Sequence, residues 1–364
     1  MLFQLSHIFK NIPVHSWSML EYPLIAAKTL KTRLFRDFNL GRELPWKLLI
    51  EINRVCNHKC LNCSIWESPK KETLPLRIYK QLFKENENLF WVSLTGGEPF
   101  LRHDIDQIAG LAEQYCPDLK FLSIPTDGFR TDIILEKAKA MQKMKFDLNL
   151  TISLDGPREI HDAIRGKAGA YDAALKTFKI LSQHNINVRF QSTLHKQNLA
   201  AFKQFYLQHK KDIGVLTFTQ VSDIYYDNDK VKPLTGQEAA EVFHFIEEHF
   251  EMHKKQDLFE KMHLKIAQQY MKKKDMMLPC TAGFSGAFIS SSGDVHPCFF
   301  MKPWGNIKHE SFRNIWFNGI AREEREKIKK KQCPQCWVNC FSFNDMLTYP
   351  EKAAARAYLK VPPA

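Results

Sequence analysis

Short apolar runs alternate with segments of helical periodicity through the middle of this chain. The apolar runs are rich in β-branched and aromatic residues, which favour strands, whereas the intervening segments repeat their apolar positions about every 3.6 residues, as amphipathic helices do. The strands expected from this pattern are residues 48–53, 90–94, 120–124, 148–153, 187–191 and 215–219. The expected helices are residues 76–86, 105–115, 133–144, 173–183 and 199–209.

Six successive units of strand and helix predict a parallel sheet, because parallel neighbours need crossover connections. Such a sheet either closes partly, as a partial (β/α)6 barrel similar to a TIM barrel, or opens into a doubly wound sheet. The pattern alone does not choose between them. In both folds ligands bind at the carboxyl ends of the strands, so functional residues are expected there.

Changes in composition and periodicity along the chain predict five segments. A helical extension precedes the alternating core, two charged amphipathic helices form a bridge after it, and a loop-rich segment with glycines, serines and five cysteines follows. That last module has too little apolar sequence to fold without metal. The expected bounds are 1–45 for the extension, 46–225 for the core, 226–279 for the bridge, 280–345 for the cysteine-rich module and 346–364 for a short helix and tail.

Composition agrees with a soluble globular protein, since 44% of the 364 residues are hydrophobic and 25% are charged. No apolar stretch is long enough to span a membrane and no signal peptide is visible, so a cytoplasmic protein is expected. Residues 1–40 mix aromatics with basic residues, which is compatible with peripheral membrane contact, although a packed helical extension is favoured. The net charge of +12 is weak evidence for an acidic partner, because the lysine clusters at 272–274 and 327–331 are typical of solvated helix faces, and nucleic-acid binding is not expected.

Eight of the nine cysteines fall into two groups, which argues for metal ligation because a reducing cytosol disfavours disulfides. The first group, Cys56, Cys60 and Cys63, directly follows the first expected strand. A loop with this spacing can place three thiolates on three irons of an iron-sulfur cube and leave the fourth iron open. An open iron suits a catalyst better than an electron carrier. Zinc fits poorly, because structural zinc prefers a closed set of four ligands.

This CxxxCxxC loop resembles the signature of radical S-adenosylmethionine (SAM) enzymes. The resemblance implies a partial (β/α)6 barrel in which the methionyl end of SAM chelates the open iron of a [4Fe-4S] cluster. Reductive cleavage of SAM then gives methionine and a 5′-deoxyadenosyl radical. Cys56, Cys60 and Cys63 are thereby the expected metal ligands and the catalytic centre. Asn62 departs from the aromatic residue usual in the family at the position before the third cysteine.

A second motif, Gly96-Gly97-Glu98, follows the second expected strand. Two glycines let the backbone approach a ligand closely, and the glutamate can accept a charge-assisted hydrogen bond from an ammonium group. The resemblance makes this the GGE motif that holds the amino group of SAM. It also implies that Ser153 contacts the ribose and that Arg165 pairs with the SAM carboxylate, because both lie in or after the loop that follows the fourth strand. Otherwise this loop is an ordinary turn.

The second cysteine group resembles the SPASM and twitch modules, which hold auxiliary [4Fe-4S] clusters. Five cysteines suffice for one fully ligated cluster, so one auxiliary cluster and a twitch-like arrangement are expected. Two of the last three cysteines would join the first two. A four-cysteine zinc site is the main rival. The candidate ligands are Cys280, Cys298, Cys333, Cys336 and Cys340.

Together these features predict a radical SAM enzyme that abstracts hydrogen from a substrate. Relatives with such modules often modify peptides or proteins, and a peptide or protein is the favoured substrate. A dehydrogenase or carbon-carbon bond former acting on a sugar, lipid or cofactor precursor is the alternative, and a non-catalytic iron-sulfur or zinc protein is a further one. The resemblance also implies a reducing partner such as flavodoxin or ferredoxin.

Overall fold

The structure, a computed structural model, describes residues 21–69, 72–213, 217–220, 231–250 and 257–358. The chain divides into two units, each assembled from segments that are far apart in sequence. The barrel unit comprises Leu44–Pro233 and Gly286–Ala321. The helical unit comprises Met1–Glu43, Leu234–Ser285 and Arg322–Ala364.

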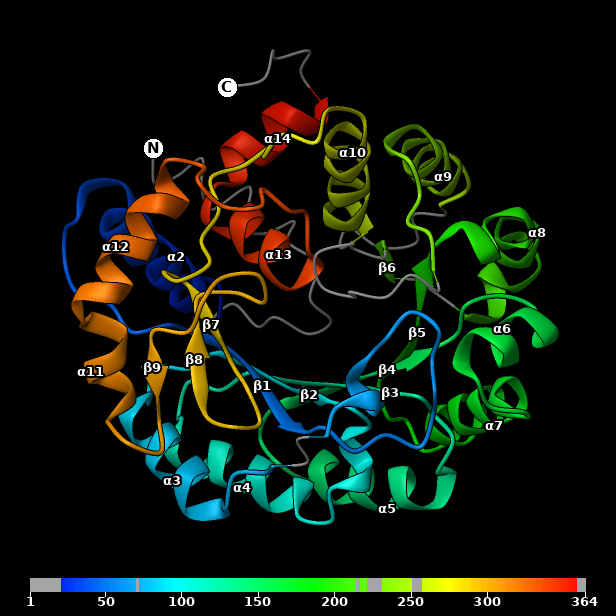
Figure 1. The fold of residues 1–364 in the computed structure, drawn as a ribbon, viewed down its shortest axis with the longest axis horizontal. Helices are drawn as coiled ribbons and strands as arrows, with labels where there is room; N and C mark the ends of the chain where they lie inside the picture. The colour runs from blue at the N-terminus through cyan, green and yellow to red at the C-terminus, as the bar shows by residue number, and fades with distance from the viewer. Residues whose placement is uncertain (1–20, 70–71, 214–216, 221–230, 251–256, 359–364) are drawn as a thin grey trace. The chain divides into compact units, whose positions relative to one another are not determined.

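A nine-stranded sheet runs through the barrel unit in the order β6-β5-β4-β3-β2-β1-β7-β8-β9 (Figure 1). Strands β1 to β6 pair in parallel with their neighbours in sequence, which confirms the predicted parallel sheet. The strands are β1 (Lys47–Asn53), β2 (Trp91–Gly96), β3 (Phe121–Thr126), β4 (Asp147–Ser153), β5 (Val188–Leu194), β6 (Thr217–Gln220), β7 (Gly286–Ile289), β8 (Asp294–His296) and β9 (Gly305–Asn306).

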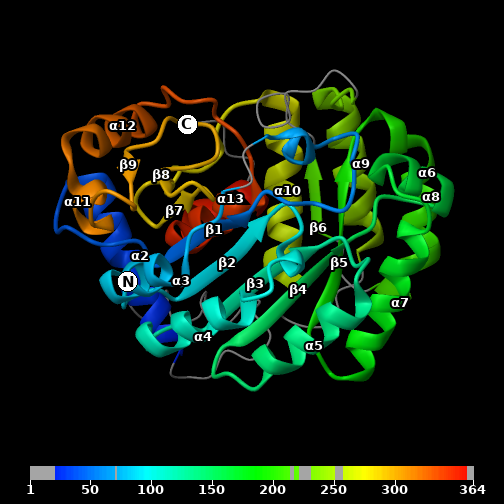
Figure 2. The same cartoon turned by 60° about the horizontal axis from the view of Figure 1, so that its bottom comes forward.

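The crossover helices of the barrel unit lie along the outer face of the curved sheet, as Figures 1 and 2 show. The result is the partial (β/α)6 barrel that the resemblance implied. Short 3-10 turns η1 (Ile65–Glu67) and η2 (Pro99–Leu101) lie in the loops after β1 and β2. The helices are α3 (Leu76–Glu85), α4 (Ile105–Tyr115), α5 (Thr131–Gln142), α6 (Arg158–Arg165), α7 (Ala170–Gln183), α8 (Lys196–Ile213) and α11 (Phe312–Phe317).

The two faces of the sheet differ in polarity. In β4, Leu148, Leu150 and Ile152 are buried, whereas the alternate residues, such as Asn149 and Thr151, are half-buried. Because successive side chains of a strand point to opposite faces, the apolar set packs under the helices and the polar set faces the barrel interior. The inner face can therefore receive a polar ligand.

Arg102 fixes the chain on both sides of the loop that follows β1. Its guanidinium donates to the carbonyl oxygens of Ile52 and Leu74, each at 2.8 Å, and pairs with Asp104 at 2.6 Å. The Arg102 and Asp104 side chains are only 7% and 11% exposed. The guanidinium, held in place by this ion pair, therefore joins the end of β1 to the segment that returns from the cysteine loop.

The C-terminal cysteine-rich sequence contributes strands to the same sheet. β7 pairs in parallel with β1, and β8 and β9 continue the sheet antiparallel. The turn between β7 and β8 contains Gly293 at φ +94, a left-handed conformation that favours glycine. The backbone N–H of Ser291 in this turn donates to the Glu51 carboxylate at 2.9 Å. The hairpin is thus held to the strand that leads into the first cysteine group.

The helical unit is built from α2 (Glu21–Phe38), α9 (Gly236–His249), α10 (Asp257–Lys273), most of α12 (Gly319–Lys329), α13 (Asn339–Thr348) and α14 (Pro350–Tyr358). A capping box between Thr235 and Glu238 starts α9. Near the first cysteine of the second group, Asp345 accepts hydrogen bonds from the backbone N–H and hydroxyl of Thr281 at 2.6 and 2.7 Å. Arg36 donates to the Cys280 carbonyl oxygen at 2.8 Å.

Within the described ranges, no helix has the length and apolar character needed to cross a membrane. The segment for which peripheral membrane contact was considered, residues 1–40, is described only from residue 21, where α2 begins. Residues 359–364 of the expected tail lie outside the described residues as well.

Replacing Arg102 with methionine should lower the free energy of unfolding by about 3 kcal/mol, because it leaves the buried Asp104 carboxylate without its cation. Chemical denaturation of the purified protein measures the change. The control is Arg158→Met, since Arg158 forms an ion pair with Asp172 in which both side chains are about half exposed, and such pairs contribute less than about 1 kcal/mol. Equal losses in the two variants would contradict the structural role of Arg102.

Candidate functional site

The first cysteine group lies on the loop that leaves β1. Cys60 is 8% exposed and Cys56 and Cys63 are half-buried. Two backbone hydrogen bonds hold the loop to the C-terminal end of α6: Lys59 N–H donates to the Arg165 carbonyl oxygen at 3.2 Å, and Leu61 N–H donates to that of Ile164 at 2.8 Å. The loop is therefore supported by a helix about one hundred residues later in the chain.

Burial disfavours the charged thiolate form of these three cysteines in the absence of metal. It raises the pKa of Cys56 to about 12, that of Cys63 to about 11, and that of Cys60 as well. Bound iron would supply the positive charge that a buried thiolate needs. In the described part of the chain, no three His, Cys, Asp or Glu side chains converge so as to hold a single metal ion. A cubane needs another arrangement, in which each thiolate meets its own iron, and three thiols on one loop fit that requirement.

The two glycines of the second motif lie directly against the cysteine loop. A Cβ atom on Gly96, which has φ +149, would lie 2.3 Å from the Asn53 carbonyl oxygen, and one on Gly97 would lie 2.2 Å from that of Val55. The backbone N–H groups of Gly97 and Glu98 donate to these same oxygens at 3.0 and 2.9 Å. The structure thus brings the two motifs together, and glycine is required for their close approach.

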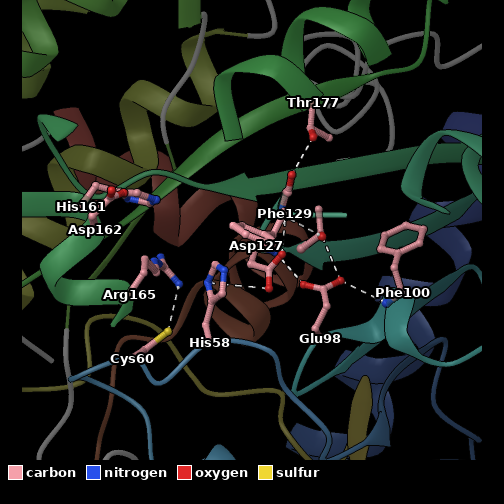
Figure 3. A network of polar contacts seen from close by, with 12 residues as sticks. His58, Cys60, Glu98, Phe100, Asp127, Phe129, His161, Asp162, Arg165 and Thr177 are labelled. Carbon is pink, nitrogen blue, oxygen red and sulfur yellow. Dashed lines mark hydrogen bonds and ion pairs between the residues drawn. The ribbon is translucent and has the colours of Figure 1, made fainter. Parts of the chain in front are cut away.

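Glu98 is buried to 1% exposure and accepts hydrogen bonds from three protein donors (Figure 3). Its Oε1 accepts from Thr126 Oγ1 at 2.9 Å and from Phe100 N–H at 3.1 Å, and its Oε2 accepts from Asp127 N–H at 2.7 Å. Burial and the neighbouring Asp127 carboxylate raise its pKa well above the ordinary value. In this structure the side chain joins the ends of β2 and β3, and its expected contact with the SAM amino group stays a prediction.

His58 was not among the residues assigned to the site from sequence, yet it lies inside it. It is 1% exposed, its ring meets that of Phe129 edge-on at 5.4 Å, and its Nδ1 is 3.7 Å from Asp127 Oδ2. Burial lowers the pKa of His58 to about 4, although Asp127 acts in the opposite direction. Only its place within the cysteine loop could have indicated this from sequence.

Ser153 and Arg165 occupy different positions relative to the loop. Ser153 ends β4 with its side chain half-buried. Arg165 ends α6, and its Nη1 lies 3.9 Å from Cys60 Sγ while its Nε lies 2.7 Å from Asp155 Oδ2. Burial acts to lower the pKa of Arg165, but Asp155 and Cys60 outweigh it and raise the pKa. Arg165 therefore stays charged beside the loop.

A cavity of about 600 Å³ in the barrel unit adjoins Cys63. It lies where β1 and β7 end, and its walls are polar and apolar in similar measure, with the rings of Phe288 and Phe299 among charged and hydroxyl side chains. Residues that line it include Glu51, Arg54, Cys63, Phe288, Asp294 and His296. Its volume lies in the range of ligand pockets.

The second cysteine group is divided between the units. Cys298 follows β8 in the barrel unit and is 8% exposed. Cys280, Cys333, Cys336 and Cys340 belong to the helical unit and are half-buried. Left-handed backbone at Lys331 and Gln335 shapes the turn that carries two of them. The ligand role of all five stays a prediction.

The ninth cysteine, Cys116, is a buried residue at the end of α4. Its thiol lies 3.5 Å from the Asn86 carbonyl oxygen and 3.8 Å from that of Phe83. This position is that of a structural thiol, far in sequence from either cysteine group.

A curved, largely parallel sheet whose first strand leads into three cysteines at the carboxyl edge is the arrangement expected of an iron-sulfur enzyme with a partial barrel. Comparison with family models agrees: residues 50–208 match the radical SAM superfamily, and residues 280–341 match the SPASM iron-sulfur cluster-binding domain. Together the two matches cover more than half of the chain. The chain belongs to the radical SAM superfamily and carries a C-terminal SPASM module.

Similar proteins include AlbA of Bacillus subtilis, an antilisterial bacteriocin subtilosin biosynthesis protein, which is 28% identical over 82% of this chain and 64% of AlbA. The chain thus spans slightly less than two thirds of AlbA. The AdoMet-dependent heme synthase of Methanosarcina barkeri is 26% identical over 84% of this chain and 93% of that protein. Among solved structures, Streptococcus suis SuiB bound to precursor peptide SuiA shares the fold, with a TM-score of 0.60, 17% identity and coverage of 83% of this chain and 72% of SuiB.

Gly97→Ala should displace the cysteine loop, because its Cβ would meet the Val55 carbonyl oxygen, and should lower the free energy of unfolding by about 2 kcal/mol. Iron bound per chain after anaerobic reconstitution should fall as well. Gly110→Ala is the matched control, since the nearest atom to its Cβ is Met144 Cε at 3.8 Å and alanine favours the helix. Full iron loading of Gly97→Ala would show that the close approach is not needed.

Proposed function

We propose that this protein cleaves SAM reductively at a [4Fe-4S] cluster held by Cys56, Cys60 and Cys63, and abstracts hydrogen from a peptide or protein substrate. The observation that carries the proposal is the contact of the cysteine loop with the Gly96-Gly97-Glu98 turn, supported by the family matches. When bound, the cluster supplies the electron that breaks SAM into methionine and a 5′-deoxyadenosyl radical.

In this proposal the residues of the chain bind the iron, orient SAM and shield the radical. The three thiols would bind iron, and the Gly96-Gly97-Glu98 turn would hold the amino group of SAM. Ser153 and Arg165 would contact the ribose and carboxylate of SAM. The buried walls of the site, with Glu98 at 1% exposure, would protect the radical from side reactions with solutes that donate hydrogen.

A peptide or protein substrate is favoured by two comparisons. One relative is named for the biosynthesis of a bacteriocin, and a structure of the same fold was solved with a precursor peptide bound. The cavity beside Cys63, at about 600 Å³, can accept a side chain together with its neighbouring backbone.

A small-molecule substrate is the second candidate. A heme synthase aligns over 93% of its own length, a larger share than the 64% of AlbA. In this case the same cavity would hold the whole reacting group. Incubation with synthetic peptides and with porphyrin precursors, followed by mass spectrometry, separates the two candidates.

The SPASM module is proposed to hold one auxiliary [4Fe-4S] cluster on four of Cys280, Cys298, Cys333, Cys336 and Cys340. That cluster could accept the electron left after hydrogen abstraction, which would make the net reaction a two-electron oxidation. A flavodoxin or ferredoxin is the proposed source of the electron that starts the reaction.

Reconstituted protein treated with dithionite and SAM should release 5′-deoxyadenosine, and Cys60→Ala should reduce the release to background, because one iron loses its ligand. Liquid chromatography of the quenched reaction measures the product. Cys116→Ser is the control, since this thiol is buried at the end of α4 and should leave the release unchanged. Release from Cys60→Ala at the wild-type rate would refute the assignment.

The wild-type protein should bind about eight irons per chain if it holds two cubes, and the Cys333→Ala/Cys336→Ala double variant about four. Iron analysis and zinc analysis of the same samples distinguish an auxiliary cluster from a zinc site. Release of 5′-deoxyadenosine without substrate should persist in the double variant. Retention of full turnover of a known substrate would remove the electron-acceptor role.

A further inference from the structure

Asp155, in the loop after β4, is held by contacts from three directions and has no exposed surface. Its Oδ1 accepts from the Thr193 N–H at 2.9 Å, its backbone N–H donates to His161 Nδ1 at 3.1 Å, and its carbonyl oxygen accepts from Asn198 Nδ2 at 3.0 Å. An ordinary turn aspartate would need none of this support. The second carboxylate oxygen, Oδ2, is left for the Arg165 guanidinium at 2.7 Å.

Helix α6 places this ion pair against the cysteine loop. His161 and Arg165 are four residues apart and so lie on one face of the helix, toward Asp155. The helix ends at Gly166, whose φ is +57 and where an added Cβ would lie 2.4 Å from the Lys59 carbonyl oxygen. The loop therefore contacts the end of α6 closely, and Arg165 Nη1 reaches to 3.9 Å from Cys60 Sγ (Figure 3).

A fixed cation beside a cluster ligand changes the energy of adding an electron. Reduction adds one negative charge to a cluster, and a guanidinium a few ångströms away stabilises that charge strongly where water is excluded. The Arg165 side chain is 11% exposed and that of Asp155 has no exposed surface, so solvent screens the interaction little.

We infer that Arg165 raises the reduction potential of the cluster bound to Cys60, and that Asp155 is a positioning residue that holds the guanidinium there. The inference rests on the proposed function, because it needs a cluster on the first cysteine group. It goes beyond the expected contact of Arg165 with the SAM carboxylate, because it operates before SAM binds.

The two variants Arg165→Gln and Asp155→Asn test the inference, because simple electrostatics gives them opposite signs. Loss of the Arg165 charge should disfavour reduction. Loss of the Asp155 charge by itself should favour reduction. Loss of the ion pair that holds Arg165 beside Cys60 should disfavour reduction, because the guanidinium is then free to move away. A positioning role therefore predicts that both variants shift the potential in the same direction.

The measurement is an anaerobic redox titration of the reconstituted full-length protein without SAM, followed by electron paramagnetic resonance. The relevant signal is the one that is missing from a Cys63→Ala variant. At a fixed potential, the ratio of reduced to oxidised cluster should fall at least about fivefold in Arg165→Gln, and should also fall in Asp155→Asn.

Controls on the same helix separate the charge from general damage. Arg158→Gln alters an arginine that is half exposed and paired with Asp172, and Asp162→Asn alters a carboxylate that accepts from the N–H groups of Gly169 and Tyr171. Both should leave the ratio within about twofold of wild type, because neither group contacts the cysteine loop. Arg165→Lys, which keeps the positive charge, should lie closer to wild type than Arg165→Gln.

An unchanged ratio in Arg165→Gln, or an unchanged or higher ratio in Asp155→Asn, would overturn the inference. If Arg165→Gln fails to bind iron, Arg165→Lys and Asp155→Asn decide, and an equal fall in Arg165→Lys and Asp155→Asn would exclude the charge as the cause. Failure of the proposed function looks different. In that case the wild-type protein itself would lack a cluster signal that depends on Cys63.

Discussion

Three thiols on one loop, one buried and two half-buried, are the constraint on which the site depends. A buried thiolate is costly in an apolar surrounding, and the raised pKa values of Cys56, Cys60 and Cys63 express that cost. Two positive charges can offset it: the iron that the thiolates are proposed to bind and the Arg165 guanidinium beside Cys60. Iron binding and the charge of Arg165 therefore both stabilise the thiolate form of these cysteines.

The shape of the loop is set by parts of the chain other than the cysteines. Backbone groups of Gly97 and Glu98 bind one side of it, and the carbonyl oxygens at the end of α6 bind the other. Backbone hydrogen bonds of this kind do not depend on metal. The loop can therefore present its thiols in a defined arrangement, and iron binding need not order the whole segment.

Local pattern was enough to predict β1 to β6, because the alternation of buried and half-buried residues along a strand such as β4 follows from the order of apolar and polar residues in the sequence. Residues 215 and 216 of the sixth expected strand lie outside the described residues. The helix α4 was likewise predicted at its observed bounds, 105–115. Motif spacing located Gly96 and Gly97 beside the cysteine loop, because both motifs end neighbouring parallel strands. These features depend on residues close together in the chain.

Contacts between distant segments could not be predicted in this way. The pairing of β7 with β1 joins residues more than two hundred positions apart, and nothing in either run specifies its partner. The three donors to Glu98 and the ion pair of Asp155 with Arg165 depend on how loops meet at the sheet edge. Polar residues in turns have many possible partners, so their roles emerge only from tertiary packing.

The cavity beside Cys63 shows how the same packing restricts what could react there. Glu51 pairs with Arg54 at 3.0 Å. Burial acts to raise the pKa of Asp294, but hydrogen bonds from Ser292, Asn306 and Ser290 outweigh it and lower the pKa, so this carboxylate stays ionised and already solvated by the protein. Because Glu51 and Asp294 already have partners within the wall, a polar but uncharged group loses least beside them. Specificity for a charged substrate would have to come from other residues, such as Glu67 and Glu72, whose carboxylates also line the cavity.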